Sequence, residues 1–358
     1  MEEETIKTKV CPCCRIEKNI DEFGNAKYSQ NGYNCTCKEC VNERARLYRK
    51  TVNGVLHEIF NHANKNAKTR RDNNREEAGK FEIDFDDLEN LFKKQNGKCY
   101  YSGIKMNFDR NDWKISLERI NPNLGYIKGN IALCCGEFNS ICQWTLEKIQ
   151  EMKLILNQNI IDNPTNFEIN TNRKKPCKIQ SIIIDNITYF RCTKCDINKT
   201  RDNFSKIISS GCRDCGKIIK KNVLNSPRGS LQQLLDSAKK HTKRREGTQI
   251  KNRDNSFDID LNVLIDKFKE QKGLCYYSGI PLKFGSYLET NWKVSLERLD
   301  VLKGYTIENI CLICLEFQGS DKSAIYNDNT KGNSGWTREK FQYFLEHIRV
   351  VSILNLGH

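Results

Sequence analysis

The chain has 358 residues, with 59 Lys and Arg against 45 Asp and Glu, and therefore a formal net charge of +14. It contains 18 Cys and five His, and 38% of its residues are hydrophobic, as is typical of a soluble globular protein. It has no run of 18 apolar residues and no apolar segment near its start, which argues against a membrane span and a secretory signal.

These properties predict an intracellular protein, in the cytoplasm or the nucleus, with no membrane partner. Cysteines in such a compartment stay reduced, so metal ligation and buried thiols are expected in preference to disulfides. The excess of positive charge favours a nucleic-acid partner. A solvated basic surface without a specific partner is the alternative.

The first predicted element is a pair of cysteine turns that would hold one structural zinc ion. Each turn presents two thiolates separated by two residues, and 22 residues separate the turns. Redox-active cysteines or four buried thiols are the alternatives. Cys13 and Cys35 lie beside the site and make the choice of ligands less certain. The expected ligands are Cys11, Cys14, Cys37 and Cys40.

Helices and short strands follow in chain order. Apolar residues at helical spacing predict a helix over 56–63. Asp84 is expected to cap a second helix and Thr145 a third. Short strands are expected around 98–108 and 113–119. The polar, Asn-rich stretch 157–176 is typical of a linker, and SIIIDNITYF (181–190) predicts a β-hairpin.

The remainder of the chain repeats what precedes the linker. The recurring pairs are GKCYYSGIKMNF (97–108) with GLCYYSGIPLKF (273–284), FEIDFDDLENLFKKQ (81–95) with FDIDLNVLIDKFKEQ (257–271), and WTLEK (144–148) with WTREK (336–340). A second zinc site is expected at Cys192, Cys195, Cys212 and Cys215. Asp260 and Thr337 would cap the copied helices. Several elements recur in the same order, so a whole module was duplicated.

The predicted fold class is α+β, with two tandem modules that each combine a four-cysteine zinc knuckle with a larger domain. The expected boundaries are 1–52 and 188–226 for the knuckles, 53–158 and 227–358 for the larger domains, and 159–187 for the linker.

Basic residues gather directly after each zinc site. Residues 201–255 alone contain 14 Lys and Arg against five Asp and Glu, a concentration that favours binding to a phosphate backbone. Basic helices that are merely solvated remain the alternative. The residues expected to contact nucleic acid are Arg44, Arg46, Arg49, Lys68, Arg70, Arg71, Lys217, Lys220, Lys221, Lys243, Arg244 and Arg245.

One further repeated segment carries a resemblance to a known family. WKISLERINPNLGYIKGNIALCCGEFN (113–139) recurs as WKVSLERLDVLKGYTIENICLICLEFQ (292–318). The S-L-E-R, G-Y, N and E-F elements resemble the ββα-metal finger of HNH endonucleases, also called His-Me finger nucleases. The resemblance is greatest to a branch common in large phages and large DNA viruses, which is compatible with a virus-encoded protein.

This resemblance implies metal-dependent cleavage or nicking of double-stranded or branched DNA. A carboxylate and an amide 21 residues later, which the resemblance places on the following helix, would hold one Mg²⁺ or Mn²⁺ ion. The asparagine between them would tie down a loop, and the arginine would contact a scissile or flanking phosphate. The implied catalytic residues are Glu118, Arg119, Asn130 and Asn139, with Glu297, Arg298, Asn309 and Gln318 in the second module.

The chain departs from the family at the general base. Arg119 and Arg298 stand where the family has a histidine, and an arginine cannot accept a proton. A metal-bound hydroxide or a side chain from elsewhere would have to act, and the first module is the better candidate. Three functions stay open: an HNH-like endonuclease, a catalytically degenerate zinc-containing nucleic-acid-binding protein, and a zinc-stabilised protein-interaction scaffold.

Four further cysteines occupy matching positions in the two copies. Related fingers carry a second zinc site of four cysteines here, but two of those positions hold Ser102 and Phe138, with Ser278 and Phe317 in the copy. Buried thiols are therefore expected, with a residual metal site as the alternative. The four residues are Cys99, Cys135, Cys275 and Cys314.

Overall fold

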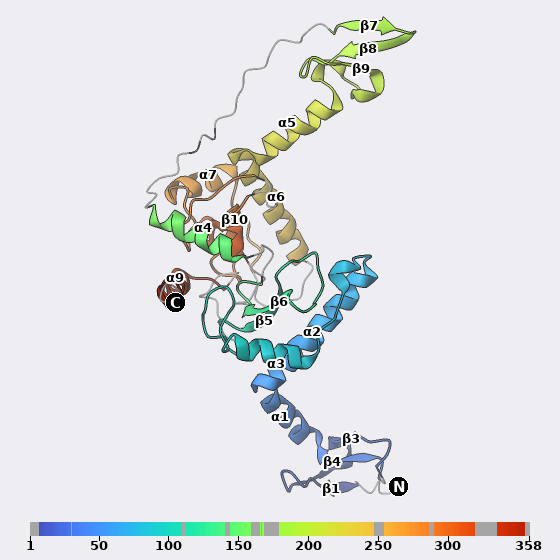
Figure 1. Cartoon of the computed structure of the whole chain (residues 1–358), viewed down its shortest axis with the longest axis vertical. Coiled ribbons are helices and arrows are strands. Elements are labelled where there is room, and N and C mark those ends of the chain that lie inside the picture. Colours follow the sequence, from blue (N-terminus) through green and yellow to red (C-terminus); the bar gives the residue numbers. More distant parts are fainter. Residues whose placement is uncertain are drawn as a thin grey trace. The chain divides into compact units, whose positions relative to one another are not determined.

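The computed structural model describes residues 7–29, 31–108, 112–139, 144–158, 165, 167, 179–246, 254–285, 290–318 and 335–354, without the side chains of 245, 246 and 349–354. The chain divides into two compact units, Met1–Asn139 and Ser140–His358. Figure 1 shows helices and small antiparallel sheets, which confirms the predicted α+β class. None of the described helices is long and apolar enough to cross a membrane.

The first unit opens with a small cysteine-rich module. Its elements are β1 (Thr8–Val10), β2 (Glu17–Asn19), β3 (Phe23–Asn25), β4 (Tyr33–Cys37) and α1 (Lys38–Tyr48). β1 pairs with β2 and β3 with β4, both antiparallel. The buried core of this module consists of Phe23 and two cysteines. Such a core is too small to hold the segment without a metal.

The rest of the first unit is a helical layer and a β-hairpin. Its elements are α2 (Val52–Asp72), α3 (Phe85–Lys94), β5 (Ile115–Arg119) and β6 (Ile131–Cys135). The Thr51 side chain caps α2 by accepting a hydrogen bond from the backbone nitrogen of Gly54 at 3.1 Å. Asp84 and Asp87 form a reciprocal capping box at the start of α3, which confirms the predicted cap.

The second unit contains a three-stranded sheet and a second hairpin with its helices. Its elements are α4 (Leu146–Asn157), β7 (Ser181–Ile184), β8 (Ile187–Arg191), β9 (Asn198–Thr200), α5 (Arg213–Asn225), α6 (Pro227–Glu246), α7 (Leu261–Glu270), β10 (Val294–Arg298), β11 (Ile310–Cys314) and α9 (Arg338–Leu354). The predicted hairpin is β7–β8, and its turn residues Asp185 and Asn186 have φ of 49° and 61°. These left-handed values are those of a two-residue hairpin turn.

The two copies of the finger segment have the same topology. β5 pairs with β6 so that Glu118 faces Ala132, and β10 pairs with β11 so that Glu297 faces Cys311. The connecting loop passes close to an upstream segment at Gly125, where a Cβ atom would lie 2.1 Å from the backbone oxygen of Lys80. Only glycine permits this approach, which accounts for the Gly-Tyr pair in the motif.

Helix α4 belongs to the second unit, although the repeat pattern assigns it to the first module. Lys148 Nζ lies 3.1 Å from Glu316 Oε1, and both side chains are almost wholly buried. Glu151 accepts a hydrogen bond from Trp292 Nε1 at 3.1 Å, and Trp144 packs edge to face on the same ring. The structural division at residue 139 thus differs from the repeat boundary at 158, because contacts and not sequence order decide where a helix packs.

Candidate functional site

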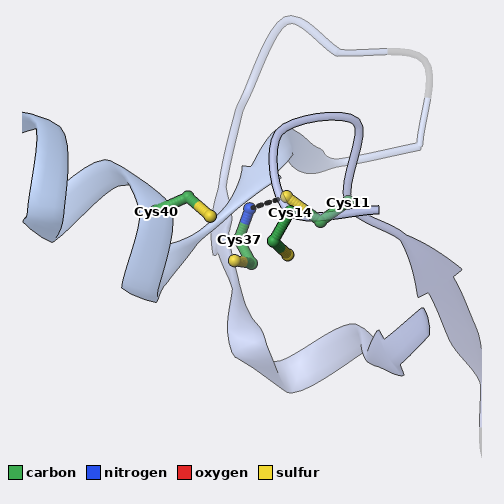
Figure 2. A group of neighbouring side chains, drawn as sticks. All are labelled: Cys11, Cys14, Cys37 and Cys40. Atoms are coloured by element: carbon green, nitrogen blue, oxygen red, sulfur yellow. Dashed lines mark hydrogen bonds between the residues drawn. The ribbon is translucent and has the colours of Figure 1, made fainter. Parts of the chain in front are cut away.

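The first cysteine cluster is formed by the β1–β2 loop and the junction of β4 with α1. Figure 2 shows its four side chains gathered there, with the backbone nitrogen of Cys37 donating to Cys11 Sγ at 3.4 Å. All four sulfur atoms lie within 4.8 Å of one another, a spacing compatible with a tetrahedral zinc ion. The residues are those predicted: Cys11, Cys14, Cys37 and Cys40.

The second cluster repeats this arrangement before α5. Its sulfur atoms are 3.9 Å apart in the pairs Cys192–Cys215 and Cys195–Cys212. Tetrahedral thiolates at about 2.3 Å from a zinc ion are about 3.8 Å from one another. The geometry therefore fits one zinc ion without rearrangement. Phe204 is buried beside the cluster, so the cysteines again form much of the small core.

Backbone amides in both clusters favour the thiolate form that a metal requires. Amide hydrogen bonds, chiefly from Cys37, lower the pKa of the Cys11 thiol to about 6. Burial raises the pKa of Cys192, but amides of Cys195 and Cys212 outweigh it and bring this pKa to about 6. One thiol in each cluster therefore gives up its proton to a metal more readily than a free thiol does, whereas neighbouring thiols raise the pKa of Cys40 and burial raises the pKa of Cys215.

The other cysteines that the structure describes do not extend these clusters. Cys13 and Cys35 are exposed and lie outside the first group of four. The predicted finger thiols Cys99 and Cys135 are buried, and the backbone nitrogen of Cys135 donates to Cys99 Sγ at 3.3 Å. Their copies, Cys275 and Cys314, make the same contact at 3.3 Å. These four residues are thus buried thiols, as expected.

In the first finger, the predicted acid Glu118 lies on β5, and the predicted amide Asn139 contacts the same strand. The Asn139 side-chain nitrogen donates to Ser116 Oγ at 2.9 Å and to the backbone oxygen of Leu117 at 3.0 Å. Ser116 and Glu118 are two residues apart on β5 and therefore share a face. Burial raises the pKa of the Glu118 carboxyl to about 7, against the opposing effect of Arg119. A divalent cation would favour the charged form.

Asn139 follows a turn after β6 instead of lying on a helix. Both of its hydrogen bonds use the amide nitrogen, so Oδ1 is the atom that this residue would offer to a cation. Its counterpart Gln318 likewise follows a short 3-10 helix, Leu315–Phe317. The family pattern of a ligand on an α-helix is therefore not reproduced in the described residues.

The loop asparagines Asn130 and Asn309 each bind the backbone of their own loop. Asn130 accepts a hydrogen bond from the backbone nitrogen of Asn121 and donates to the backbone oxygens of Asn121 and Gly125, at 2.8, 3.1 and 2.9 Å. Asn309 makes the equivalent three bonds to Asp300 and Gly304, at 2.8, 3.0 and 2.8 Å. One buried side chain thus closes each loop.

The arginines after the acidic residues bind the same loops. Arg119 Nη1 donates to the backbone oxygens of Pro122 and Leu124 at 2.7 and 2.8 Å. Arg298 is fully buried and donates to the two equivalent oxygens at 2.9 and 3.0 Å. Each guanidinium also lies over the loop tyrosine. This placement fits a role in positioning the loop and leaves the implied phosphate contact without support.

The second finger holds its acid differently. Glu297 is fully buried and accepts hydrogen bonds from Gln318 Nε2 at 2.8 Å and from the Tyr277 hydroxyl at 3.4 Å. Ser295 donates to Gln318 Oε1 at 3.0 Å. The acid and the amide of the second finger therefore bind each other directly.

The first unit contains a cavity of about 360 Å³ between α2 and the hairpin. Asn139, Ser116 and Tyr126 line it from the finger, and one face of α2 forms the other side. The polar residues that α2 contributes recur every fourth position: Glu58, His62, Asn66 and Arg70. The four-residue spacing of these polar side chains can be read from the sequence. The prediction of a helix over 56–63 is based on apolar residues alone, so it does not identify His62 as a functional residue.

The predicted basic residues lie on helices or directly after them. On α2, Lys68 is exposed, while Arg71 donates to the backbone oxygen of Gly79 and so stabilises a turn. Arg245 lies outside the described side chains. Arg70 lines the cavity. The other predicted basic residues are exposed, on or next to α1, α5 and α6: Arg44, Arg46, Arg49, Lys217, Lys220, Lys221, Lys243 and Arg244.

Comparison with models of known protein families finds no match, and a search of curated protein sequences finds none either. The geometry of these sites is therefore what supports a functional proposal.

Proposed function

We propose that the chain is an HNH-like endonuclease that cleaves or nicks DNA with a divalent metal ion. The observation that carries this proposal is that Asn139 donates to Ser116 and Leu117 of β5, the strand that carries Glu118, next to the loop closed by Asn130. Glu118 and Asn139 Oδ1 would hold one Mg²⁺ or Mn²⁺ ion, which supplies charge stabilisation at the phosphate. Carboxylate and amide oxygens are ligands that these hard cations prefer.

The zinc clusters serve DNA binding in this proposal. Each cluster would hold a zinc ion that fixes the start of a helix, α1 or α5, and these helices expose Arg44 and Lys217 among others. Basic side chains on a metal-fixed helix keep a defined spacing toward a phosphate backbone. The zinc ions are structural, because four thiolates leave no open position for substrate.

The proposal assigns cleavage to the first finger. Glu297 is enclosed by Gln318 and Tyr277, so a cation would have to displace two hydrogen bonds to reach it. Breaking those contacts in a buried site costs about 1–3 kcal/mol for each group left unsatisfied. The second finger thus acts in structure or in DNA binding.

The test is a cleavage assay on labelled duplex DNA with a series of divalent metals and an EDTA control. Wild-type protein should cut with Mg²⁺ or Mn²⁺, and Glu118→Gln should bind the same duplex but not cut it. Glu297→Gln is the matched variant and should retain cleavage. Equal cleavage by wild type and Glu118→Gln would contradict the assignment.

A catalytically degenerate nucleic-acid-binding protein is the second candidate. It is favoured by the arginines that stand in place of the histidine, because Arg119 and Arg298 donate to loop carbonyls and cannot act as a general base. This candidate predicts binding whose affinity falls steeply with salt, and no cleavage with any metal.

A further inference from the structure

We propose that the cavity between α2 and β5 receives the scissile phosphodiester, and that His62 supplies the general base that the finger motif lacks. This inference rests on the proposed function. It assigns a catalytic role to a helix outside the finger motif, and it limits hydrolysis to one of the two modules.

The helical repeat of α2 places His62 over the finger. Glu58, His62 and Arg70 are separated by multiples of four residues, and all three line the cavity together with Asn139 and Ser116. The imidazole therefore shares an open space with the amide proposed to bind the metal. An imidazole is the side chain that most readily exchanges a proton at neutral pH.

The charges around the cavity suit an anion. Arg70 and Lys114 line it, with Glu58 as the single acidic group among its lining residues. Arg70 Nη1 is buried and has no hydrogen-bond partner among the described residues, while its guanidinium lies 5.4 Å from the ring centre of Tyr126. A buried guanidinium donor without an acceptor is costly unless a ligand supplies one. A phosphate oxygen is such an acceptor, and it matches the geometry of the guanidinium.

The reaction balances with the groups present and water. His62 takes a proton from a water molecule, and the water oxygen bonds to phosphorus as the bond to the 3′ oxygen breaks. The 3′ oxygen leaves with the bonding electron pair and takes a proton from solvent, and the imidazolium returns its proton to solvent. The products are a 5′-phosphate and a 3′-hydroxyl.

The second module lacks this arrangement. Its matching helix α6 has Ser237 where α2 has His62, and Gln233 where α2 has Glu58. A serine hydroxyl is not a general base at neutral pH. Gln233 donates to the backbone oxygen of Leu224 at 2.6 Å and so serves the helix junction.

Two variants at the same helical position test the proton transfer. His62→Ala should lower the nicking rate by about 10²- to 10⁴-fold, while the affinity of the zinc-replete protein for duplex DNA, measured without added Mg²⁺ or Mn²⁺, stays within about twofold. Added imidazole should restore part of the rate to His62→Ala but not change wild type. Ser237→Ala is the matched control and should cut at the wild-type rate. A wild-type rate for His62→Ala, or a loss that imidazole does not restore, would overturn the assignment of the base.

Binding to the cavity is measured separately from cleavage. Inorganic phosphate titrated into the zinc-replete protein, in buffer without other metals, should shift the His62 ring resonances in a saturable way, and Arg70→Ala should abolish that shift. No shift in wild type would overturn the phosphate subsite. A saturable shift together with no cleavage under any metal would sustain the subsite and overturn both the base and the proposed nuclease function.

Discussion

At the scale of single residues, the same side-chain types perform different tasks in the two fingers. Asn130 and Asn309 close their loops with equivalent bonds, so this part of the motif is structural in both copies. Glu118 and Glu297 stand at equivalent positions, and Glu297 accepts a hydrogen bond from Gln318, the counterpart of Asn139. The change from Asn139 to Gln318 adds one methylene, which is enough for the amide to reach the carboxylate.

Replacing a loop asparagine should destabilise the unit that contains it. In Asn130→Ala one backbone nitrogen loses its acceptor and two backbone oxygens lose their donor. We expect the free energy of unfolding to fall by about 3 kcal/mol, measured by urea denaturation. Asn123→Ala, at an exposed position in the same loop, should change it by less than about 0.5 kcal/mol. Equal effects of the two variants would contradict the role of Asn130.

The motif residues could be located from the sequence. The loop carbonyls that Arg119 binds, and the position of His62 beside the finger, could not. Whether Arg119 faces a phosphate or the carbonyls of Pro122 and Leu124 depends on how the loop folds back, which residue order does not state. His62 lies 56 positions before Glu118 and meets the finger only through packing of α2.

At the scale of elements, each zinc knuckle depends on its cluster. The buried residues of the first knuckle are Phe23 and two of the ligands, so apolar burial contributes little to its stability. The predicted cysteines gather in two groups of four, as expected. The sequence could predict this because the spacing of two cysteines within one turn is a local property. The exclusion of Cys13 and Cys35 required the folded loop and strand, which leave both exposed to solvent.

Removing one ligand should release one zinc ion and unfold one knuckle. Cys37→Ser should lower the zinc content from about two ions per chain to about one. Hydrogen exchange should become fast over 8–48, because metal binding supplies most of the folding free energy of such a segment. Cys13→Ser is the control and should keep both ions. A zinc content near zero in the wild type would refute the interpretation of both clusters.

Helix α4 stabilises the second finger through a buried ion pair. Lys148→Met would leave the buried Glu316 carboxylate without this cation, although the backbone nitrogen of Trp292 would still donate to it. We expect a loss of about 3–5 kcal/mol in unfolding free energy for the second unit, measured by chemical denaturation. Lys303→Met removes an exposed pair whose closest atoms are 4.0 Å apart and should cost less than about 1 kcal/mol.

At the scale of the whole molecule, the boundary between the two compact units does not coincide with the boundary between the two sequence repeats. The repeats predicted two copies, and the matching hairpins β5–β6 and β10–β11 agree with that. The unit boundary lies at residue 139, since α4 packs with Trp292 and Glu316 of the second unit. Comparison of the two repeats aligns α4 with α9. It does not tell which of the two fingers α4 packs against.

A fragment that starts at the second sequence repeat should therefore be less stable than the whole second unit. Residues 188–358 lack α4, whereas residues 140–358 keep the whole second unit. We expect the shorter fragment to have a lower melting temperature and faster hydrogen exchange over 292–318, because Trp292 and Glu316 lose their partners on α4. Indistinguishable melting of the two fragments would show that α4 does not stabilise this finger.

The central claim is that one finger of a duplicated pair hydrolyses DNA, and the product of a supercoiled plasmid tests it most directly. A single active site cuts one strand per encounter, so the account predicts a nicked open circle with Mg²⁺ or Mn²⁺. That product should be retained by Glu297→Ala and lost by Glu118→Ala. No conversion of the plasmid with any divalent metal, or equal loss of activity in the two variants, would contradict it.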